Sequence, residues 1–357
     1  MNELCKLIAA VAPLDSAAMD AARARQARLA KPPGSLGRLE ALSVQLAGIT
    51  GRVYNTPEKK RLLVFAADNG VVAEGVTSAP QSVTLAQTVN LAHGRTGAGV
   101  LARRFGCAVT VCDVGVAAAI DDPAVLDRKI AYGTQNIAEG PAMTRAQAVQ
   151  AILTGAELAR QADADVLGVG EMGIGNTTTS AAVLAALLGA DAEAVTGRGG
   201  GLTDAGFERK KAVVARALSV NAPDRRDPVD VLAKVGGFDL AAMCGAFLGA
   251  AAAKKPAVID GYISAVAALC AVRLCHGVRD YLIPSHASAE PGCALAMEAL
   301  ELKPMLLLDM RLGEGSGCPP AMALLDAACA VLNGMATFGE AGIDDQYLDP
   351  IREAGHG

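Results

Sequence analysis

A glutamate between two glycines is the residue of this sequence best placed to take a proton. Glu314 lies in the segment 311–317, Arg-Leu-Gly-Glu-Gly-Ser-Gly, after an apolar run at 304–310 that we expect to form a buried strand. The Ala- and Leu-rich stretch that begins at Cys318 predicts a helix. Ligands of open α/β sheets bind at the carboxyl ends of the strands, and glycines let the backbone approach a substrate closely. We therefore expect Glu314 to act as a general base.

A second glycine-rich segment, at 168–180, has the features of a phosphate site. It joins an expected strand at 165–170 to an expected helix and reads Gly-Val-Gly-Glu-Met-Gly-Ile-Gly-Asn-Thr-Thr-Thr-Ser. The N–H groups at a helix N-terminus, with a dipole of about half an elementary charge, favour an anion there. The segment matches neither the Walker A nor the G-x-G-x-x-G pattern. The alternative is a tight strand–helix turn capped by threonines.

A third glycine-rich segment could complete this phosphate site. The loop 196–204, Thr-Gly-Arg-Gly-Gly-Gly-Leu-Thr-Asp, leads into Arg-Lys-Lys at 209–211. Three successive glycines suit a close backbone approach to a ligand, and a lysine on the next helix would supply a point charge. From spacing alone, a solvent-exposed charged face explains 209–211 equally well.

Polar residues follow two further expected strands. Asp-Asn-Gly-Val-Val at 68–72 precedes the segment 74–80 and a helix that carries Gln87, and a turn with Asx caps is the alternative reading. Ser-His-Ala-Ser-Ala-Glu at 285–290 has the residue types of a hydrolase triad, but no G-x-S-x-G elbow is present. Ser288 as a helix N-cap is the simpler explanation there.

Three aspartates, Asp239, Asp260 and Asp309, stand near the ends of expected elements. Two or three carboxylates could hold Mg²⁺, but enzymes that bind pyrophosphate through a metal usually present an acidic pair on one strand. No such pair occurs on an expected strand, and the four histidines show no ligand spacing. We therefore expect neither a metal nor a cofactor.

Short β-rich runs alternate with longer helical runs from residue 61 onward. This alternation predicts βαβ units and an α/β fold with a mainly parallel sheet. The expected strands are 61–67, 108–114, 165–170, 256–260, 280–284 and 304–310. The expected helices are 81–103, 144–162, 177–188, 204–220, 238–253, 262–276, 288–300 and 319–336.

Both ends of the chain read differently from this α/β region. Asp15 and Ser16 can cap a helix that runs to about Leu29, and Ser35 is a possible N-cap of the next helix. We expect a small helical domain from 1–58 plus 337–357, and a large α/β catalytic domain from 59–336.

Composition favours a small-molecule substrate. The formal net charge is -5, aromatic residues make up 3% and tryptophan is absent, which argues against nucleic acid and against acidic membranes. The longest apolar stretch, 240–253, is shorter than the roughly 18 residues that span a bilayer. The nine cysteines form no C-x-x-C, and no signal peptide is evident, so we expect a cytoplasmic protein with reduced thiols.

Five segments together resemble the nicotinate-nucleotide:5,6-dimethylbenzimidazole phosphoribosyltransferases. They are K-P-P-G-S-L-G-R-L-E at 31–40, G-E-M-G-I-G-N-T-T at 170–178, K-V-G-G-F-D at 234–239, I-P-S-H at 283–286 and M-R-L-G-E-G-S-G at 310–317. The resemblance extends from the N-terminal helices to about residue 336. It implies a homodimer with a Rossmann-like sheet and a small helical domain built from both chain ends.

The resemblance also implies a reaction. Nicotinate mononucleotide and 5,6-dimethylbenzimidazole would give nicotinate and α-ribazole 5′-phosphate, with inversion at C1 of the ribose, for the lower nucleotide of cobalamin. Glu314 would be the base, and Glu171 would face the ribose or support the base. The expected substrate-binding residues are Ala79, Gln87, Met172, Gly173, Gly175, Asn176, Thr177, Thr178, Gly200, Lys210, Leu312, Gly313 and Gly315.

One departure concerns the acceptor base. We expect Ser-Pro in relatives where this chain has Ala79-Pro80, so a hydroxyl near the acceptor is missing. Two alternatives stay open from the residues: a nucleotide sensor without turnover, which would not need Glu314, and a nicotinamide-dependent dehydrogenase, which the missing G-x-G-x-x-G after the first strand disfavours.

Overall fold

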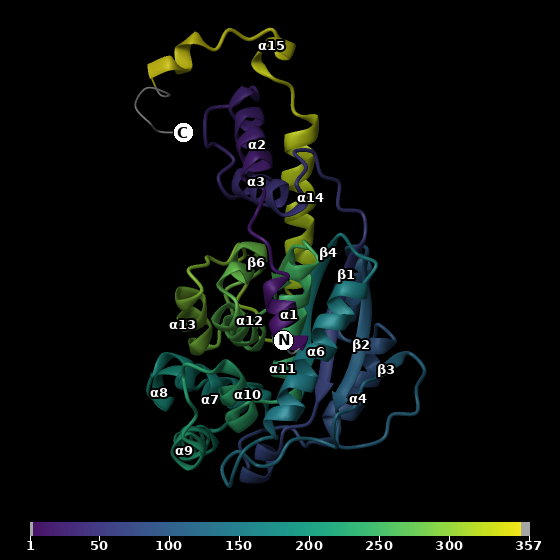
Figure 1. Cartoon of the computed structure of the whole chain (residues 1–357), viewed down its shortest axis with the longest axis vertical. Helices are drawn as coiled ribbons and strands as arrows, with labels where there is room; N and C mark the ends of the chain where they lie inside the picture. The colour runs from purple at the N-terminus through teal and green to yellow at the C-terminus, as the bar shows by residue number, and fades with distance from the viewer. Residues whose placement is uncertain (1–2, 351–357) are drawn as a thin grey trace.

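A six-stranded, all-parallel sheet organises the chain, of which the computed structural model describes residues 3–350. Figure 1 shows the sheet among the helices of the larger part of the molecule. The strand order is β3-β2-β1-β4-β5-β6, so the chain changes direction across the sheet between β1 and β4, where Rossmann folds bind ligands. The strands are β1 Lys60–Ala67, β2 Cys107–Gly115, β3 Val125–Asp127, β4 Val166–Met172, β5 Ala257–Ile259 and β6 Leu282–Pro284. The predicted fold class is confirmed.

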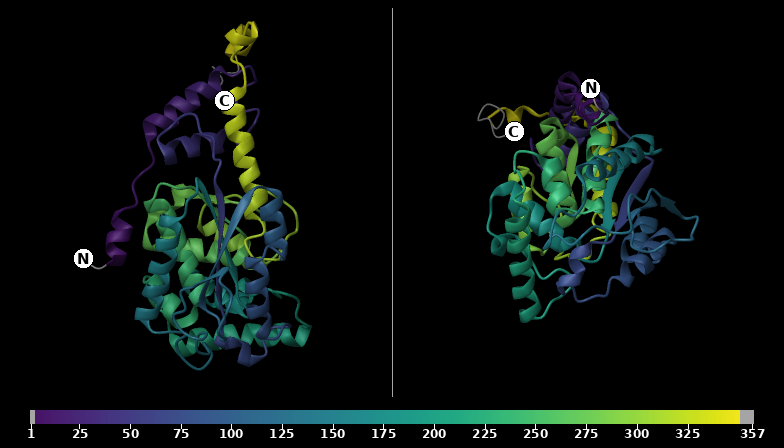
Figure 2. Two further views of the ribbon diagram at one scale, coloured as in Figure 1. Left: turned by 90° about the vertical axis from the view of Figure 1, so that its right-hand side faces the viewer. Right: turned by 60° about the horizontal axis from the view of Figure 1, so that its bottom comes forward.

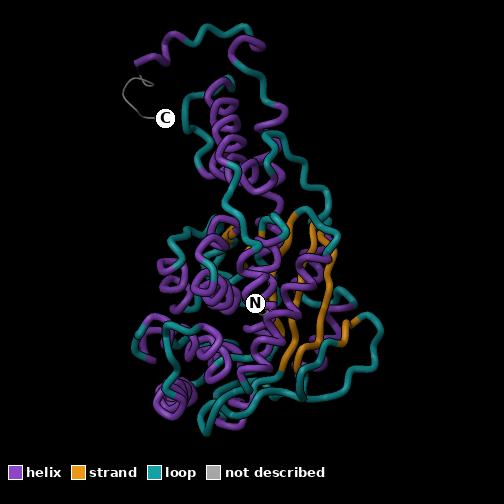
Figure 3. Tube along the Cα trace, viewed as in Figure 1, coloured by secondary structure: helices purple, strands orange, loops and turns teal. Residues whose placement is uncertain are grey.

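Helices cover both faces of this sheet, as Figure 3 shows with strands in orange and helices in purple. The first helices are α1 Glu3–Ala9, α2 Ser16–Arg28, α3 Arg38–Thr50, α4 Ser82–Ala92, α5 Gly97–Arg104, α6 Arg145–Gln161, α7 Asn176–Leu188 and α8 Ala192–Val195. The later ones are α9 Asp204–Asn221, α10 Pro228–Val235, α11 Phe238–Ala252, α12 Tyr262–Leu274, α13 Pro291–Ala299, α14 Cys318–Gly334 and α15 Phe338–Ala341. Short 3₁₀ helices are η1 Gly70–Glu74, η2 His276–Tyr281 and η3 Gln346–Leu348.

Alternate side chains of β1 point into two different hydrophobic cores. Leu63 and Phe65 belong to the core that contains α6, α7, α11 and α12. Leu62 and Val64 belong to the core that contains parts of α4, α5 and α14. Because both faces are covered, a nearly continuous apolar run can form a central strand.

Glycines bring α11 unusually close to α6. A Cβ atom built on Gly155 would lie 1.8 Å from the carbonyl oxygen of Ala242, and one on Gly245 would lie 1.8 Å from that of Ile152. The apolar run at 240–253 is therefore the buried centre of this face, as predicted. Within residues 3–350, no helix is long and apolar enough to cross a membrane.

The predicted strand at 304–310 is wrong. Leu306 makes one isolated parallel bridge with His286, and the N–H groups of Met305 and Leu306 both donate to the Ser285 carbonyl. This short contact at the edge of the sheet does not continue into a ladder. Leu307 and Leu308 are 83% and 54% exposed, so the run is apolar without being buried.

Other differences concern short elements that were missed and one helix that is divided in two. The strand β3 was not predicted, because only three residues of it pair with β2. The predicted helix 81–103 is two helices, α4 and α5, which are separated around Gly94 with its positive φ of 64°. The short α8 and α10 were also missed.

The helix caps were predicted with mixed success. The Asp15 side chain accepts from the Ala18 N–H at 2.9 Å and caps α2, as predicted. Ser35 does not cap α3, which begins at Arg38 after Gly37. Ser288 does not cap α13 either, because Pro291 fixes the first turn and Glu290 is the N-cap residue. The N-cap of α7 is Gly175, not a threonine.

A helical region stands apart from the sheet. α2 and α3 pack against the far end of α14, and the left panel of Figure 2 shows α14 extending out of the α/β part toward them. Ala22, Ala47 and Leu332 belong to this separate core. Leu4 and Leu7 of α1, in contrast, pack in the main core beside the sheet. The domain boundaries at 58 and 337 stay a prediction.

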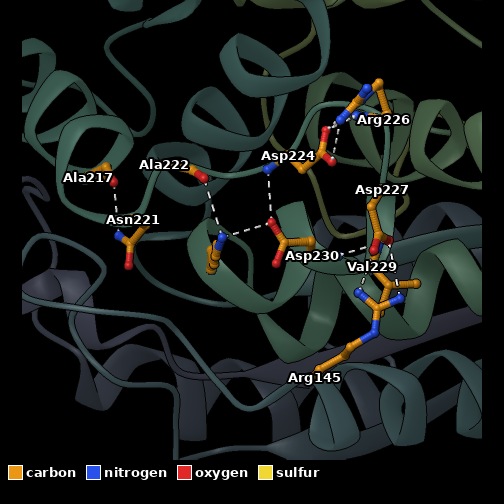
Figure 4. A network of polar contacts seen from close by, with 10 residues as sticks. Arg145, Ala217, Asn221, Ala222, Asp224, Arg226, Asp227, Val229 and Asp230 are labelled. Carbon is orange, nitrogen blue, oxygen red and sulfur yellow. Dashed lines mark hydrogen bonds and ion pairs between the residues drawn. The ribbon is translucent and has the colours of Figure 1, made fainter.

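A polar network fixes the connection between α9 and α10 (Figure 4). Arg145 of α6 pairs with Asp227, the N-cap of α10, with 2.6 Å between Nη1 and Oδ2. The other carboxylate oxygen of Asp227 accepts from the Val229 N–H at 3.1 Å. Asn221, at the end of α9, donates to the carbonyls of Ile137 and Ala217. These contacts fix the far end of the helix that carries Lys210.

Candidate active site

A pocket of about 180 Å³ lies at the carboxyl ends of β4 and β5. It lies beside the point where the strand order changes direction, which is the expected place for a ligand in this topology. Predicted site residues that line it are Ala79, Glu171, Met172, Gly173, Gly175, Asn176, Thr177, Gly200, Lys210, Leu312 and Gly313. Further lining residues that were not predicted include Ser78, Arg198, Tyr262, His286, Ser288 and Glu290.

Glu314 lies directly behind this lining. Its side chain is buried, with Oε1 accepting from Gln87 Nε2 at 3.3 Å and Oε2 accepting from the Ala98 N–H at 3.1 Å. Gly313, Glu314 and Gly315 have φ values of 84°, 62° and 81°. A left-handed conformation is costly for a glutamate. The loop therefore holds this carboxylate in a fixed place.

Gly170 on β4 admits the Glu314 loop to the sheet. A Cβ atom at this position would lie 2.6 Å from the Gly315 nitrogen and 2.9 Å from the Glu314 carbonyl carbon. Only a glycine lets two backbones approach this closely. The approach brings the two predicted catalytic glutamates together, because Glu171 is the next residue of β4.

Glu171 contacts the backbone of Glu314. Its Oε1 accepts from the Glu314 N–H at 3.3 Å, and its Oε2 accepts from Asn176 Nδ2. Burial raises the pKa of Glu171 to about 8. Burial thus favours the protonated form of this carboxyl group.

Asn176 links Glu171 to another buried acid. Its Nδ2 donates to Asp239 Oδ2 at 3.0 Å as well as to Glu171. Burial raises the pKa of Asp239 to about 6. The amide of Asn176, at the first residue of α7, is thus fixed between two carboxyl groups from β4 and α11.

Lys210 provides a buried positive charge in the pocket wall, which Arg198 and Arg311 also line. Its Nζ donates to Thr177 Oγ1 at 2.8 Å, and the residue is 1% exposed. Burial lowers the pKa of Lys210 to about 8, and nearby Glu290 opposes that shift. Gly199, whose N–H donates to Glu290 Oε1 at 2.9 Å, connects the glycine loop to the same carboxylate. A buried ammonium group beside the first turn of α7 suits a phosphate.

Asp260 and His286 form a second polar group in the pocket wall. Asp260 Oδ1 and Oδ2 accept from the N–H groups of Gly317 and Gly315 at 2.6 and 3.1 Å. His286 Nδ1 lies 3.9 Å from Asp260 Oδ1. Burial raises the pKa of Asp260, and the histidine opposes that shift. These groups tie β5 and β6 to the Glu314 loop.

The hydrogen bonds of Ser285 oppose its use as the nucleophile of a hydrolase triad at 285–290. Its buried hydroxyl donates to the Asp260 carbonyl at 2.8 Å. A hydroxyl has one proton, so it can only accept from His286 Nδ1, which lies 3.0 Å away. Ser285 is therefore not activated by this histidine. The sequence signal for His286 and Glu290 was their place after a strand, which points to the pocket rather than to a triad.

Four predicted residues do not line the pocket: Glu314, Gln87, Thr178 and Gly315. Gln87 contacts Glu314, and Gly315 contacts Asp260. Thr178 is fully buried, and its hydroxyl has no hydrogen-bond partner. Asp309, considered as a metal ligand, is exposed and lies outside the lining. Across residues 3–350, no three His, Cys, Asp or Glu side chains are grouped so that they could hold a metal ion.

Comparisons with known proteins show the family of this chain. A phosphoribosyltransferase family model, DBI_PRT, matches residues 11–343. The chain is 52% identical over 332 residues to the nicotinate-nucleotide–dimethylbenzimidazole phosphoribosyltransferase of Ruminiclostridium cellulolyticum, covering 92% of this chain and 94% of the relative. It is 46% identical to that of Clostridium tetani, covering 99% of each chain. The crystal structure of CobT from Thermus thermophilus is similar with a TM-score of 0.89 at 45% identity, covering 92% of this chain and 99% of that one.

Proposed function

The chain belongs to the phosphoribosyltransferase family whose model it matches, and we propose that it transfers the 5-phosphoribosyl group of nicotinate mononucleotide to 5,6-dimethylbenzimidazole. The products are nicotinate and α-ribazole 5′-phosphate, a nucleotide used in cobalamin synthesis. The observation that carries the proposal is the pairing of Glu171 with the Glu314 backbone beside the pocket that also contains Lys210. The proposal is that Glu314, which lies behind the lining, acts as base on a substrate whose phosphate is held by Lys210 in the same cavity.

The nucleotide would bind with its 5′-phosphate against Lys210 and the start of α7. The Lys210 ammonium group and the Thr177 hydroxyl are already in contact there. Gly199 lies against both groups, since a Cβ atom on it would lie 2.9 Å from Thr177 Oγ1 and 3.3 Å from Lys210 Nζ. With Gly200 it would allow the backbone to approach the phosphate closely. This arrangement directs the ribose toward Glu171.

The chemical step needs one base. A ring nitrogen of dimethylbenzimidazole attacks C1 of the ribose while the bond from C1 to the pyridinium nitrogen breaks, and the electron pair of that bond neutralises the pyridinium. Glu314 takes the proton from the other nitrogen of the acceptor. General-base catalysis of this kind contributes roughly 10²–10⁴-fold. Attack opposite the leaving group inverts C1 from β to α.

Ala79 bears on how the pocket holds the acceptor base. It lines the pocket near Met172 and Leu312, and its methyl group offers no hydrogen bond to the acceptor ring. We therefore infer that apolar contact holds the base, with dimethylbenzimidazole as the best-fitting acceptor.

A homodimer in the cytoplasm is part of the proposal. Leu312, which lines the pocket, is 57% exposed, and Leu307 and Leu308 earlier in the same segment are 83% and 54% exposed. Exposed apolar groups of this kind mark interaction sites, and a two-fold dimer is the commonest closed assembly. We propose that a second copy of the chain covers these leucines.

Product formation tests the function. The purified protein is incubated with nicotinate mononucleotide and dimethylbenzimidazole, and nicotinate and α-ribazole 5′-phosphate are quantified by chromatography. Both products should form in equal amounts, and omission of either substrate should abolish them. Binding of the nucleotide without any product would instead support the sensor, and reduction of a nicotinamide dinucleotide would support the dehydrogenase.

A further inference from the structure

The backbone of the Glu314 loop is held by carboxyl groups on both sides. The Glu314 N–H donates to Glu171, whereas the N–H groups of Gly315 and Gly317 donate to Asp260. Inside the loop, the Ser316 N–H donates to the Gly313 carbonyl at 2.9 Å. Asp260 is thus the acceptor for the half of the loop that leads into α14.

Asp260 is itself firmly placed at the end of β5. Its N–H donates to Ser264 Oγ at 3.1 Å, and its carbonyl accepts from Ser285 Oγ at 2.8 Å. Ser264 in turn donates to the Val169 carbonyl of β4 at 2.9 Å. The aspartate is 2% exposed, so these contacts are shielded from water. Its position is fixed by three strands, independently of the loop that it holds.

The left-handed backbone at Glu314 needs such support. Residues in sparsely populated backbone regions persist only where their surroundings over-determine them. We propose that Asp260 is a positioning residue for the reaction, which holds Gly315 and Gly317 so that the Glu314 carboxylate faces the acceptor base. The inference rests on the proposed function, because it assumes that Glu314 is the base.

A double-mutant cycle tests the role of Asp260. Asp260→Asn leaves one acceptor oxygen and places an amide donor against a backbone N–H. Losing a charge-assisted hydrogen bond should lower kcat about tenfold, while KM for nicotinate mononucleotide changes less than about twofold. In the Glu314→Gln background, the same substitution should change kcat by less than about twofold, because no base remains to be placed.

Asp113→Asn provides a control at an aspartate that also pairs with Lys129, with 2.6 Å between Lys129 Nζ and Asp113 Oδ2. Asp113 is also a buried aspartate near the carboxyl end of a strand, and its Oδ1 accepts two backbone N–H groups, from Gly115 at 3.0 Å and Val116 at 2.8 Å. It holds a different loop. Asp113→Asn should therefore change kcat by the same factor with Glu314 present or replaced.

The outcomes separate the two claims. If Asp260→Asn lowers kcat by the same factor in both backgrounds, its effect does not depend on Glu314, and the positioning role is refuted. The proposed function stands in that case. If Glu314→Gln alone keeps the parental kcat, the base assignment fails instead. Should Asp260→Asn not fold, Ser285→Ala, which removes the hydrogen bond to the Asp260 carbonyl, is tested in the same cycle. It should lower kcat only where Glu314 is present, and an equal loss in both backgrounds overturns the inference.

Discussion

Replacing Glu314 with glutamine should remove the base and preserve its surroundings. The side chain accepts two hydrogen bonds, from Gln87 Nε2 and the Ala98 N–H. In Glu314→Gln, the amide oxygen can accept from Ala98, and the new NH₂ group can donate to Gln87 after the Gln87 amide turns over. That turn breaks the hydrogen bond that Asn90 Nδ2 donates to Gln87 Oε1 at 3.1 Å, so one contact is lost and the free energy of unfolding should fall by about 1 kcal/mol.

The effect on turnover should be much larger. A glutamine cannot accept the acceptor's proton, so kcat should fall about 10²-fold or more. This corresponds to about 3 kcal/mol of lost transition-state stabilisation. The assay compares kcat, KM for nicotinate mononucleotide and the melting temperature of the parent and the variant. Near-parental turnover would refute the base assignment. So would a fall in kcat that comes with a large fall in melting temperature, because the variant would then have lost its fold.

Five further outcomes are expected. Lys210→Ala should weaken nicotinate mononucleotide about tenfold or more and leave dimethylbenzimidazole nearly unchanged in calorimetry; equal losses for both ligands would contradict the phosphate site. Because Lys210 in the free protein has a pKa of about 8, it loses its charge above that pH, and KM for the nucleotide should rise there; a KM that is flat from pH 7 to 9 would oppose this. Glu171 has a pKa raised to about 8, so its contribution to stability is complete below about pH 4.5 and lost as the pH rises through 8; Glu171→Gln should thus raise the melting temperature more at pH 8 than at pH 5, and the reverse order would be inconsistent with a buried protonated acid. Activity should survive EDTA, and light scattering at micromolar concentration should give a dimer; recovery by Mg²⁺ after a loss in EDTA, or a monomer, would count against these two expectations.

The fold was predictable because the strands are bounded by clear signals. β1, β2 and β4 are apolar runs that end in polar or glycine-rich loops, and their parallel order follows from the helices between them. The run at 304–310 has the same composition, but it lies where the sheet ends. Hydrophobicity alone does not reveal whether a helix covers a segment, so Leu307 and Leu308 were wrongly expected to be buried.

The site was predictable in its parts and not in its connections. Glu314 was singled out from its place between glycines, whereas Glu171 and Lys210 were assigned through the family resemblance, and the three roles stay predictions. The contact of Glu171 with the Glu314 N–H depends on Gly170, which brings two distant segments together, and no local pattern carries that information. Asp260 was considered as a metal ligand, whereas its oxygens accept backbone N–H groups.

The helix α14 connects the Glu314 loop to the helical region that contains α2 and α3. Its first residue, Cys318, follows the Glu314 loop, and Leu332 near its other end packs with α2 and α3. Seventeen residues of α-helix span about 25 Å, and the lower part of the rod is wedged against β4, where a Cβ atom on Gly168 would lie 2.7 Å from Cys318 Cβ. This close contact fixes the position of the first turn of α14 against β4. If α2 and α3 tilt, α14 must bend or the Glu314 loop must move. A change in α2 can therefore alter the alignment of the Glu314 carboxylate.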